Sequence, residues 1–344
     1  MNTKIIKTDP ENIDTEHIGY AAELIKSGAL VAFPTETVYG LGADATDKSA
    51  AKRIYEAKGR PSDNPLIIHI AEPADAENYA HTTPLYYRLA EAFMPGPLTV
   101  ILKKKSTIPD EVTGGLDTVA VRCPSHPIAR ALISASGVAI AAPSANTSGS
   151  PSPTAAQHVI HDLNGRIDAI IDGGDAEIGL ESTIVNLDGE VATLLRPGAI
   201  TKDALECVCE RVDICDAVLH SLGENERPLS PGMKYRHYAP SSPLVLLDGS
   251  PEDTLAFLKN EQTKGKPVIL CYSEELPYLA NERLICVGAR DDLSSHARTL
   301  FSALREADKI GGDVIYAHIP SKDGLGLALY NRMIRAASHT VKKI

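Results

Sequence analysis

The chain has little of what marks a membrane protein, a disulfide-rich protein or a zinc protein. None of its apolar runs approaches the roughly 20 residues that a membrane-spanning helix needs. Its six cysteines are scattered and do not form the paired spacings of a zinc site or a disulfide framework. The first residues, MNTKIIKTDPENID, contain no apolar signal-peptide core, so we expect a cytoplasmic protein with no membrane contact.

The common signatures of nucleotide-binding and hydrolytic proteins are also missing. The phosphate loop GxxxxGK[ST], the nucleophile elbow GxSxG and the zinc motif HExxH do not occur. GLGADA at Gly40 and GLGLAL at Gly324 both fail the dinucleotide fingerprint GxGxxG. Any ligand must therefore be bound by a less common arrangement of residues.

A basic excess is lacking as well. The net charge is −11; residues 241–344 are neutral, with 13 basic and 13 acidic side chains, whereas the first 240 residues hold 21 basic and 32 acidic ones. A general phosphate-backbone binder normally carries a basic excess. Affinity for a polyanion would have to come from a local cluster of cations.

Length and pattern predict two α/β domains. The 344 residues are long for one domain, and strands alternate with helices on both sides of a proline-rich stretch. We predict a first α/β domain over 1–210, a linker over 211–242 and a smaller parallel α/β domain over 243–344. The stretch MKYRHY, residues 233–238, makes the linker unusually aromatic and cationic, so we hypothesise that it also covers a ligand.

Three polar residues are predicted to cap helices. Asp47 precedes the helical pattern Lys48–Ala57, Thr154 precedes a pattern that begins at Ala155, and Thr201 precedes a short helix.

Residues 28–70 look like one wall of a site. An apolar strand, Ala29–Phe33, ends at Pro34, and a second apolar strand, Leu66–Ile70, carries His69 as its one polar residue. Between them lie hydroxyls, two glycines that allow a tight backbone path, and the polar stretch KGRPSDNP. Ligands commonly bind where strands of an α/β sheet end.

More strand-end cations and hydroxyls follow. Each could have an ordinary explanation: Arg122 as a surface ion pair, Ser144 and Asn146 as turn residues, His69 as a core histidine. Arginine forks and hydroxyls nevertheless suit carboxylates and phosphates. The candidates are Lys58, Arg60, Asn64, His69, Thr118, Arg122, Ser144, Asn146, Ser152, Ser182 and Arg196.

Taken together, the motifs resemble the Sua5/YrdC/YwlC family. PTETVYGLG, KGRPSDNPL, LDTVAVRCPSHP, AAPSANTSGSPSPT, ESTIV and LLRPG occur in the family's order between Gly28 and Gly198. PGMKYRHYAP and the α/β tail are similar to the long Sua5 type. The Lys-x-Arg and Ser-x-Asn signatures are Lys58/Arg60 and Ser144/Asn146.

This resemblance implies a fold and an activity. The fold would be a YrdC-like twisted open α/β sheet with a basic concave cavity, followed by a Rossmann-like domain. The activity would be L-threonylcarbamoyladenylate synthesis, a nucleotidyl transfer from ATP with L-threonine and bicarbonate or CO2. The product would pass to the machinery that makes the t6A modification of tRNA, and direct tRNA contact stays open.

The resemblance also implies roles for the residues. Mg²⁺ would be held mainly by the ATP phosphates, and Tyr235 and His237 would form a lid. The group that accepts the proton of the amine is not assigned: His69, a second substrate and water are the candidates. L-threonine would be held by Thr35, His69, Arg122, Ala142 and Ser182. ATP would be held by Lys58, Arg60, Asn64, Thr118, Ser144, Asn146, Ser152 and Arg196.

Two other function classes are weaker. An RNA-binding module would use the same cations without ATP turnover, and the acidic balance argues against it. A carbamoyl-transfer relative, as in hydrogenase maturation, would carry zinc-finger-like cysteine pairs and an acylphosphatase-like segment, and neither is found here.

Overall fold

The structure, a computed structural model, describes residues 2–220, 238–280 and 282–344. The chain forms two compact units. Among the described residues, the first contains most of residues 2–220, and the second contains residues 238–280 and 282–344 with two short segments, Gly149–Pro151 and Ile178–Leu180.

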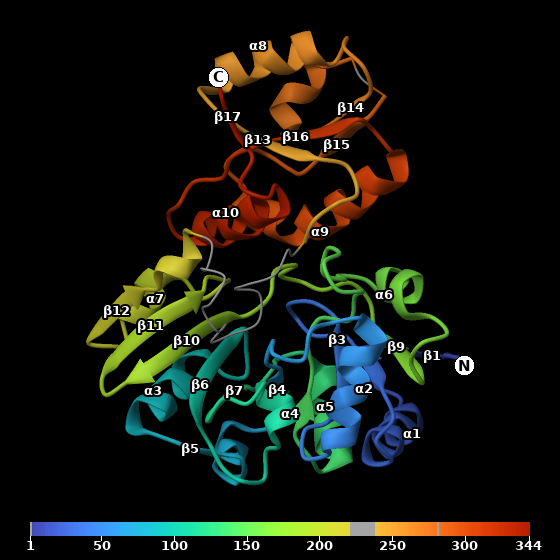
Figure 1. Cartoon of the computed structure of the whole chain (residues 1–344), viewed down its shortest axis with the longest axis vertical. Coiled ribbons are helices and arrows are strands. Elements are labelled where there is room, and N and C mark those ends of the chain that lie inside the picture. Colours follow the sequence, from blue (N-terminus) through green and yellow to red (C-terminus); the bar gives the residue numbers. More distant parts are fainter. Residues whose placement is uncertain (1, 221–237, 281) are drawn as a thin grey trace. The chain divides into compact units, whose positions relative to one another are not determined.

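The first unit is built on a twelve-stranded mixed sheet with the order β1-β9-β2-β3-β8-β4-β7-β6-β10-β11-β12, and β5 pairs with β6 beside this path (Figure 1). Its strands are β1 Lys4–Lys7, β2 Val31–Phe33, β3 Gly40–Asp44, β4 Ile67–His69, β5 Ala80–His81, β6 Leu98–Lys104, β7 Thr118–Arg122, β8 Ile140–Ala141, β9 Ala169–Asp172, β10 Thr183–Asp188, β11 Val191–Arg196 and β12 Arg211–Ile214. Its helices are α1 Thr15–Lys26, α2 Lys48–Lys58, α3 Pro84–Phe93, α4 Asp110–Thr113, α5 Pro127–Ser136, α6 Ala156–Leu163 and α7 Lys202–Glu206, with 3-10 turns η1 Pro73–Asn78 and η2 Asp216–Val218.

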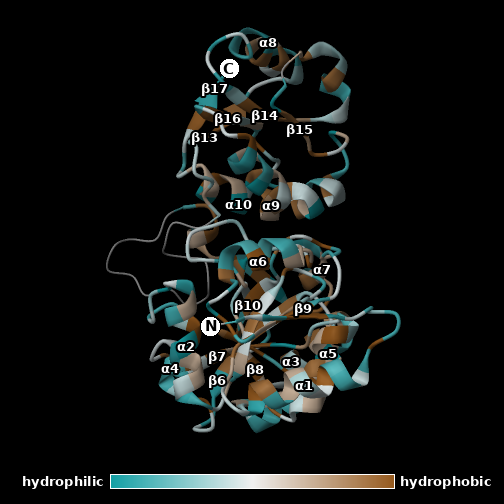
Figure 2. Cartoon of the chain, turned by 90° about the vertical axis from the view of Figure 1, so that its right-hand side faces the viewer, coloured by the Kyte–Doolittle hydropathy of each residue, from teal (hydrophilic) through white to brown (hydrophobic). Residues whose placement is uncertain are grey.

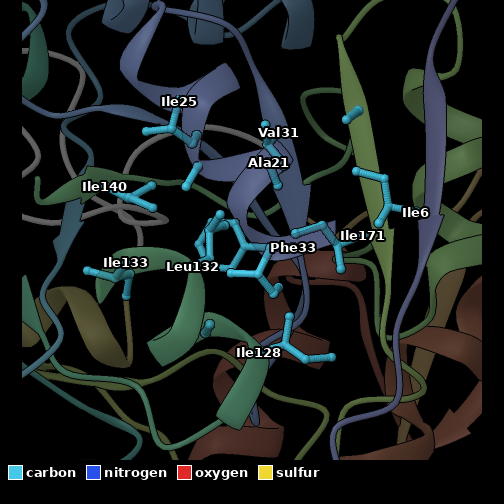
Figure 3. Close-up of a cluster of buried hydrophobic side chains, with 14 of the residues drawn as sticks. Ile6, Ala21, Ile25, Val31, Phe33, Ile128, Leu132, Ile133, Ile140 and Ile171 are labelled. Atoms are coloured by element: carbon cyan, nitrogen blue, oxygen red, sulfur yellow. The ribbon is translucent and has the colours of Figure 1, made fainter. Parts of the chain in front are cut away.

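The main core of this unit lies between one face of the sheet and helices α1 and α5. Ile25 of α1 and Leu132 of α5 pack with Phe33 of β2, and all three side chains are buried (Figure 3). Gly42 of β3 permits this packing, because a Cβ there would lie 2.8 Å from Cε1 of Phe33 and 2.7 Å from Cγ2 of Ile140. The glycines of the GLG motif are therefore strand residues that make room for the core.

The second unit has a five-stranded, all-parallel sheet with the order β15-β14-β16-β13-β17. Helix α8 covers one face, and α9 and α10 cover the other (Figure 1). Its helices show both hydrophilic and hydrophobic colours, as amphipathic helices do (Figure 2). The elements are β13 Leu244–Asp248, α8 Pro251–Glu261, β14 Pro267–Cys271, η3 Ser273–Tyr278, β15 Leu284–Cys286, α9 Leu293–Ile310, β16 Val314–His318, α10 Leu325–Ala336 and β17 Val341–Lys343.

The expected fold class is confirmed, since a mixed α/β unit is followed by a smaller parallel α/β unit. Within the range expected to be a linker, however, residues Arg211–Ile214 form β12, which pairs in parallel with β11. The proline-rich pattern begins only after this strand. The exact domain boundaries stay a prediction.

Two of the three predicted helix caps are confirmed. The side chain of Asp47 accepts from the backbone N–H of Ser49, and that of Thr201 accepts from the backbone N–H of Ala204. Thr154 is wrong as a cap, because α6 begins one residue later and Ala155 takes the cap position. The backbone N–H of Thr154 instead donates to Nδ1 of His158, and its carbonyl oxygen accepts from the backbone N–H of Ala176. These two hydrogen bonds hold Thr154 in the loop before the helix.

Candidate functional site

Strand pairing brings several predicted residues to one part of the first sheet. β4 and β7 run parallel with His69 directly beside Arg122. Ala142 follows β8, and its backbone N–H donates to the carbonyl of Ile67, 2.8 Å away. The end of β2 reaches the same place, because the ring of its last residue, Phe33, lies edge-on to the His69 ring, with the ring centroids 6.1 Å apart. Four segments that are distant in sequence thus meet around β4 and β7.

The centre of this group is a buried ion pair between Arg122 and Glu36. Nη2 of Arg122 lies 2.7 Å from Oε1 of Glu36, and the two residues are only 4% and 3% exposed. Nε of Arg122 and Oε2 of Glu36 are buried without a hydrogen-bond partner among the described residues. Buried groups of this kind are rare in folded proteins, and a bound polar ligand would satisfy them.

Glu36 is a site residue that the sequence reasoning missed. It lies inside the motif PTETVYGLG, but no spacing in that motif indicates a partner for it. The partner is 86 residues away, so only the folded chain reveals the pair.

His69 is neutral in this environment. Burial and then the positive charge of Arg122 lower its pKa to about 3. Its Nδ1 lies 3.3 Å from the carbonyl oxygen of Ile140. A histidine with so low a pKa is a weak base, so it suits hydrogen bonding to a substrate better than removing a proton from an ammonium group.

The Thr35 hydroxyl shapes the loop that carries Glu36. Its Oγ1 donates to the carbonyl of Val38 at 2.6 Å and accepts from the backbone N–H groups of Thr37 and Val38, each at 3.2 Å. This closed turn fixes the direction of the intervening residues. The Thr35 hydroxyl is thus engaged with its own loop, and its role toward threonine stays a prediction.

A second group joins Ser182 and Arg196. Nε and Nη2 of Arg196 donate to the carbonyl and the hydroxyl of Ser182 at 2.9 and 3.0 Å. The Ser182 hydroxyl also lies 2.7 Å from that of Thr99 on β6. One residue expected to hold threonine is thereby linked to one expected to hold ATP.

A third group forms at the end of α2. Lys58 is 3% exposed, and its Nζ donates to the carbonyl oxygens of Ser144 and Asn146, both at 2.5 Å. The Ser144 hydroxyl donates to Oδ1 of Asn146 at 2.5 Å. Gly59 ends the helix in the left-handed region at φ 63°, which explains why a glycine follows the lysine. The two sequence signatures, Lys-x-Arg and Ser-x-Asn, thus meet in space.

Arg60 and Asn64 lie close to each other in the loop after α2. Nη2 of Arg60 donates to the carbonyl oxygens of Asn64 and Pro65 at 3.2 and 3.1 Å. Oδ1 of Asn64 is buried and has no hydrogen-bond partner among the described residues. This oxygen is a further candidate to meet a ligand.

Thr118 stands apart from Arg122. It is the first residue of β7 and pairs with Lys103 of β6, whereas Arg122 is the last residue. At about 3.3 Å per strand residue the two are roughly 13 Å apart. Asn64 also precedes its strand, β4, so these two nucleotide candidates belong to the amino ends of strands whose carboxyl ends carry His69 and Arg122.

Ser152 has a buried acidic partner that was not predicted. Its hydroxyl donates to Oε1 of Glu181 at 2.5 Å, and Glu181 is 6% exposed. Glu181 belongs to the ESTIV motif, but only its neighbour Ser182 had been selected.

The predicted lid residues, Tyr235 and His237, lie outside the described residues. In the part of the chain that the structure describes, no three His, Cys, Asp or Glu side chains are grouped as metal ligands would be. The six cysteines are all free. No helix among the described residues is both long and apolar enough to span a membrane.

Comparison with known proteins identifies the family. Residues 23–198 match the Sua5/YciO/YrdC family, described as telomere recombination, and residues 200–338 match the threonylcarbamoyl-AMP synthase C-terminal domain. The chain is similar to threonylcarbamoyl-AMP synthases of Bacillus subtilis, 46% identical over 97% of this chain and 96% of the relative, and of Pyrococcus abyssi, 47% identical over 97% and 98%. The chain therefore belongs to the Sua5/YciO/YrdC family and carries the Sua5 C-terminal domain.

Solved structures agree with this assignment. The crystal structure of P. abyssi Sua5 complexed with L-threonine is 44% identical, matches with a TM-score of 0.92, and aligns over 99% of this chain and all of that one. The predicted family and its long, two-domain type are confirmed.

Proposed function

We propose that this chain is a threonylcarbamoyl-AMP synthase that uses L-threonine, bicarbonate or CO2, and ATP, and releases pyrophosphate. The proposal rests on the similarity of nearly the whole chain to threonylcarbamoyl-AMP synthases and to the structure of a Sua5 complexed with L-threonine. The reaction would be a nucleotidyl transfer. The product would serve t6A synthesis on tRNA, which suggests a cytoplasmic location.

Three steps account for the chemistry. The amine of threonine attacks CO2 and loses a proton, which gives a carbamate. A carbamate oxygen then attacks the α-phosphorus of ATP, and the bond to the β-phosphate oxygen breaks, so that pyrophosphate leaves with its electron pair. No side chain needs to become covalently attached. The protein must orient the reactants and balance their charge.

In this scheme Arg122 binds the threonine carboxylate. Its Nε is buried and has no partner among the described residues, and a carboxylate can receive Nε and an Nη donor together. Glu36 holds the guanidinium in place through Oε1, and its Oε2 is available to accept from the substrate. His69 is neutral and adds a hydrogen-bonding group without a charge. Thr35, Ala142 and Ser182 complete this threonine set.

The nucleotide would contact the groups around Lys58 and Arg60, with Asn64, Thr118, Ser144, Asn146, Ser152 and Arg196 as the further members of the set. Mg²⁺ would arrive on the triphosphate, because the described residues offer no ready cluster of protein ligands and Mg²⁺ commonly binds through substrate phosphates. Its chemistry there would be to neutralise charge on the phosphates. Tyr235 and His237 remain proposed as a cover that limits water.

The direct test measures pyrophosphate release by the purified chain with ATP, Mg²⁺, bicarbonate and L-threonine. We expect release that requires both L-threonine and bicarbonate, and a product with the mass of threonylcarbamoyl-AMP. Omission of each substrate in turn is the control. Pyrophosphate release that is independent of threonine, or no release at all, would reject the proposal.

A further inference from the structure

A cavity of about 260 Å³ lies within the second unit. It is lined by residues between 270 and 333, at the carboxyl ends of β14 and β16. Tyr272, directly after β14, and His318, the last residue of β16, contribute to its lining. None of the residues proposed above to bind threonine or ATP belongs to it, so it is separate from that site.

The topology of the sheet favours a ligand at this position. After β14 the chain continues to β15, which lies next to β14 at one edge of the sheet. After β16 it passes over β13 and continues to β17 at the opposite edge. β14 and β16 are neighbours, so the connections diverge between them, which makes this the topological switch point (Figure 1). In open parallel α/β sheets, the crevice at such a point is the usual ligand-binding place.

The cavity has a charged corner. Glu275, beside it, is 1% exposed, and its Oε1 lies 2.9 Å from Nε2 of His318 and 3.4 Å from Nη2 of Arg290. The Tyr272 ring stacks between those of His318 and His296, at 4.5 and 5.0 Å. The guanidinium carbon of Arg290 lies 5.4 Å from the centre of the Tyr272 ring.

This charged corner is not explained by a contribution to folding stability. Burial raises the pKa of Glu275, but its interactions with His318, the backbone N–H of Tyr272 and Arg290 together outweigh this and hold the pKa below its ordinary value. A buried ionised group contributes little net stability, and apolar residues would fill the space at least as well. What the arrangement does achieve is to fix Arg290 at the edge of the cavity.

The remaining walls are mostly apolar, with Ser321 and the stacked His296 as the polar exceptions. They come from β14, the loop after β15, β16 with the loop after it, and helices α9 and α10. The larger apolar side chains are Leu270, Val287, Leu293, Leu300, Leu329 and Met333. A ligand that fits must therefore combine an apolar body with one polar end.

We propose that this cavity binds a small organic carboxylate with an apolar tail, its carboxylate at Arg290 and its tail between α9 and α10. The Arg290 guanidinium can accommodate at most one further negative charge, because Glu275 already lies at Arg290 and the Glu274 carboxylate accepts from the Arg290 backbone N–H at 3.1 and 3.2 Å. A doubly charged phosphate would be repelled by these two carboxylates. The volume also lies below the ~300 Å³ at which pockets for drug-sized ligands begin, so a nucleotide is too large.

Isothermal titration of the full chain with 4-methylpentanoate, in the absence of ATP and threonine, tests the proposal. We expect saturable binding, and at least tenfold weaker binding of the uncharged isostere 4-methylpentanamide. Arg290→Gln should also weaken binding of the acid at least tenfold. Arg283→Gln, which removes an arginine of the same unit that does not line the cavity, should leave it unchanged.

Two further variants test whether 4-methylpentanoate binds in this cavity. Ala317→Leu narrows the cavity from β16 and should abolish binding, with the melting temperature checked for folding. Arg122→Lys should retain binding, because Arg122 belongs to the first unit. No binding to the unaltered chain, equal binding of acid and amide, undiminished binding by Arg290→Gln, or displacement of the acid by AMP would each overturn the proposal. The readout is binding, so it is independent of synthase activity.

Discussion

At the residue scale, the chemistry of the candidate site depends on an acid that the motifs did not reveal. Arg122 was selected as a carboxylate binder, and the structure adds Glu36 as its buried partner. A buried guanidinium without a partner would be costly. Glu36 therefore serves the site by balancing the charge of Arg122 and holding its guanidinium in one orientation.

Glu36→Gln should lower threonine-dependent pyrophosphate release at least tenfold. The amide keeps the shape of the carboxylate but leaves the Arg122 charge unbalanced, so we also expect a stability loss of about 1–3 kcal/mol. Steady-state kinetics at varied threonine concentration and thermal melting measure the two effects. Glu91→Gln, on the exposed side of α3, is the matched control. Unchanged kinetics in Glu36→Gln would remove Glu36 from the site.

His69 should stay neutral at pH values far below the usual pKa of histidine. Its pKa is lowered from 6.5 to about 3, so between these values the unfolded chain binds a proton that the folded chain does not. Folding stability contributed by this residue is therefore full above pH 6.5 and falls as the pH drops toward 3, by up to about 1.4 kcal/mol per pH unit.

An NMR titration of the imidazole carbons, with His69→Gln used to assign the signal, measures this pKa. The expected signal of His69 does not change between pH 7 and 5. A titration midpoint near 6.5 would contradict both the buried environment and the neutral role proposed for the ring.

At the element scale, α2 secures the loop that follows β8. Its last residue, Lys58, donates to two carbonyl oxygens of that loop. Hydrogen bonds to charged groups each contribute roughly 1.5–3 kcal/mol, so the lysine orders the loop as well as supplying a cation. The same lysine is proposed to contact the nucleotide.

Lys58→Met should loosen the loop and weaken ATP use together. We expect faster backbone hydrogen exchange over residues 144–148, because the two carbonyls lose their donor, and a rise of at least tenfold in the KM for ATP. Lys52→Met, on the same helix with a largely exposed side chain, is the control, since its pair with Glu111 is a surface one. If exchange in the loop is unchanged while the KM rises, the lysine acts on the nucleotide only.

Elements with a strong apolar pattern were predictable from the sequence, and several strands without such a pattern were not. Helices α1 and α2 and the strands β6 and β7 follow their apolar patterns closely. β1, β3 and β12 were not predicted, because each is short and is stabilised by pairing with a strand that is distant in sequence or rich in glycine. Strand order and register are tertiary properties.

At the scale of the whole molecule, each of the two units has buried hydrophobic clusters of its own among the described residues. Leu132 belongs to the core of the first unit and Leu258 to that of the second, and both are buried. Each core is formed against its own sheet. The two units can therefore lose stability separately.

Calorimetry of the full chain should resolve two unfolding transitions. Leu132→Ala should lower the free energy of unfolding of the first unit, and Leu258→Ala that of the second. We expect a loss of about 2–5 kcal/mol in each case, the usual cost of the cavity that a Leu→Ala change leaves in a core. The two variants serve as controls for each other. A single transition that both variants shift equally would show that the units unfold together.

The sequence by itself determined the family, the α/β class and the candidate residues, because the motifs stand close together along the chain and residue chemistry is readable without a structure. Tertiary structure decided what these residues meet. The Arg122–Glu36 pair, the Lys58 contacts with the loop after β8, and the charged corner at Arg290 each join residues that the sequence separates. The reason is physical: burial and strand pairing set the partners of a side chain, and both exist only in the folded chain.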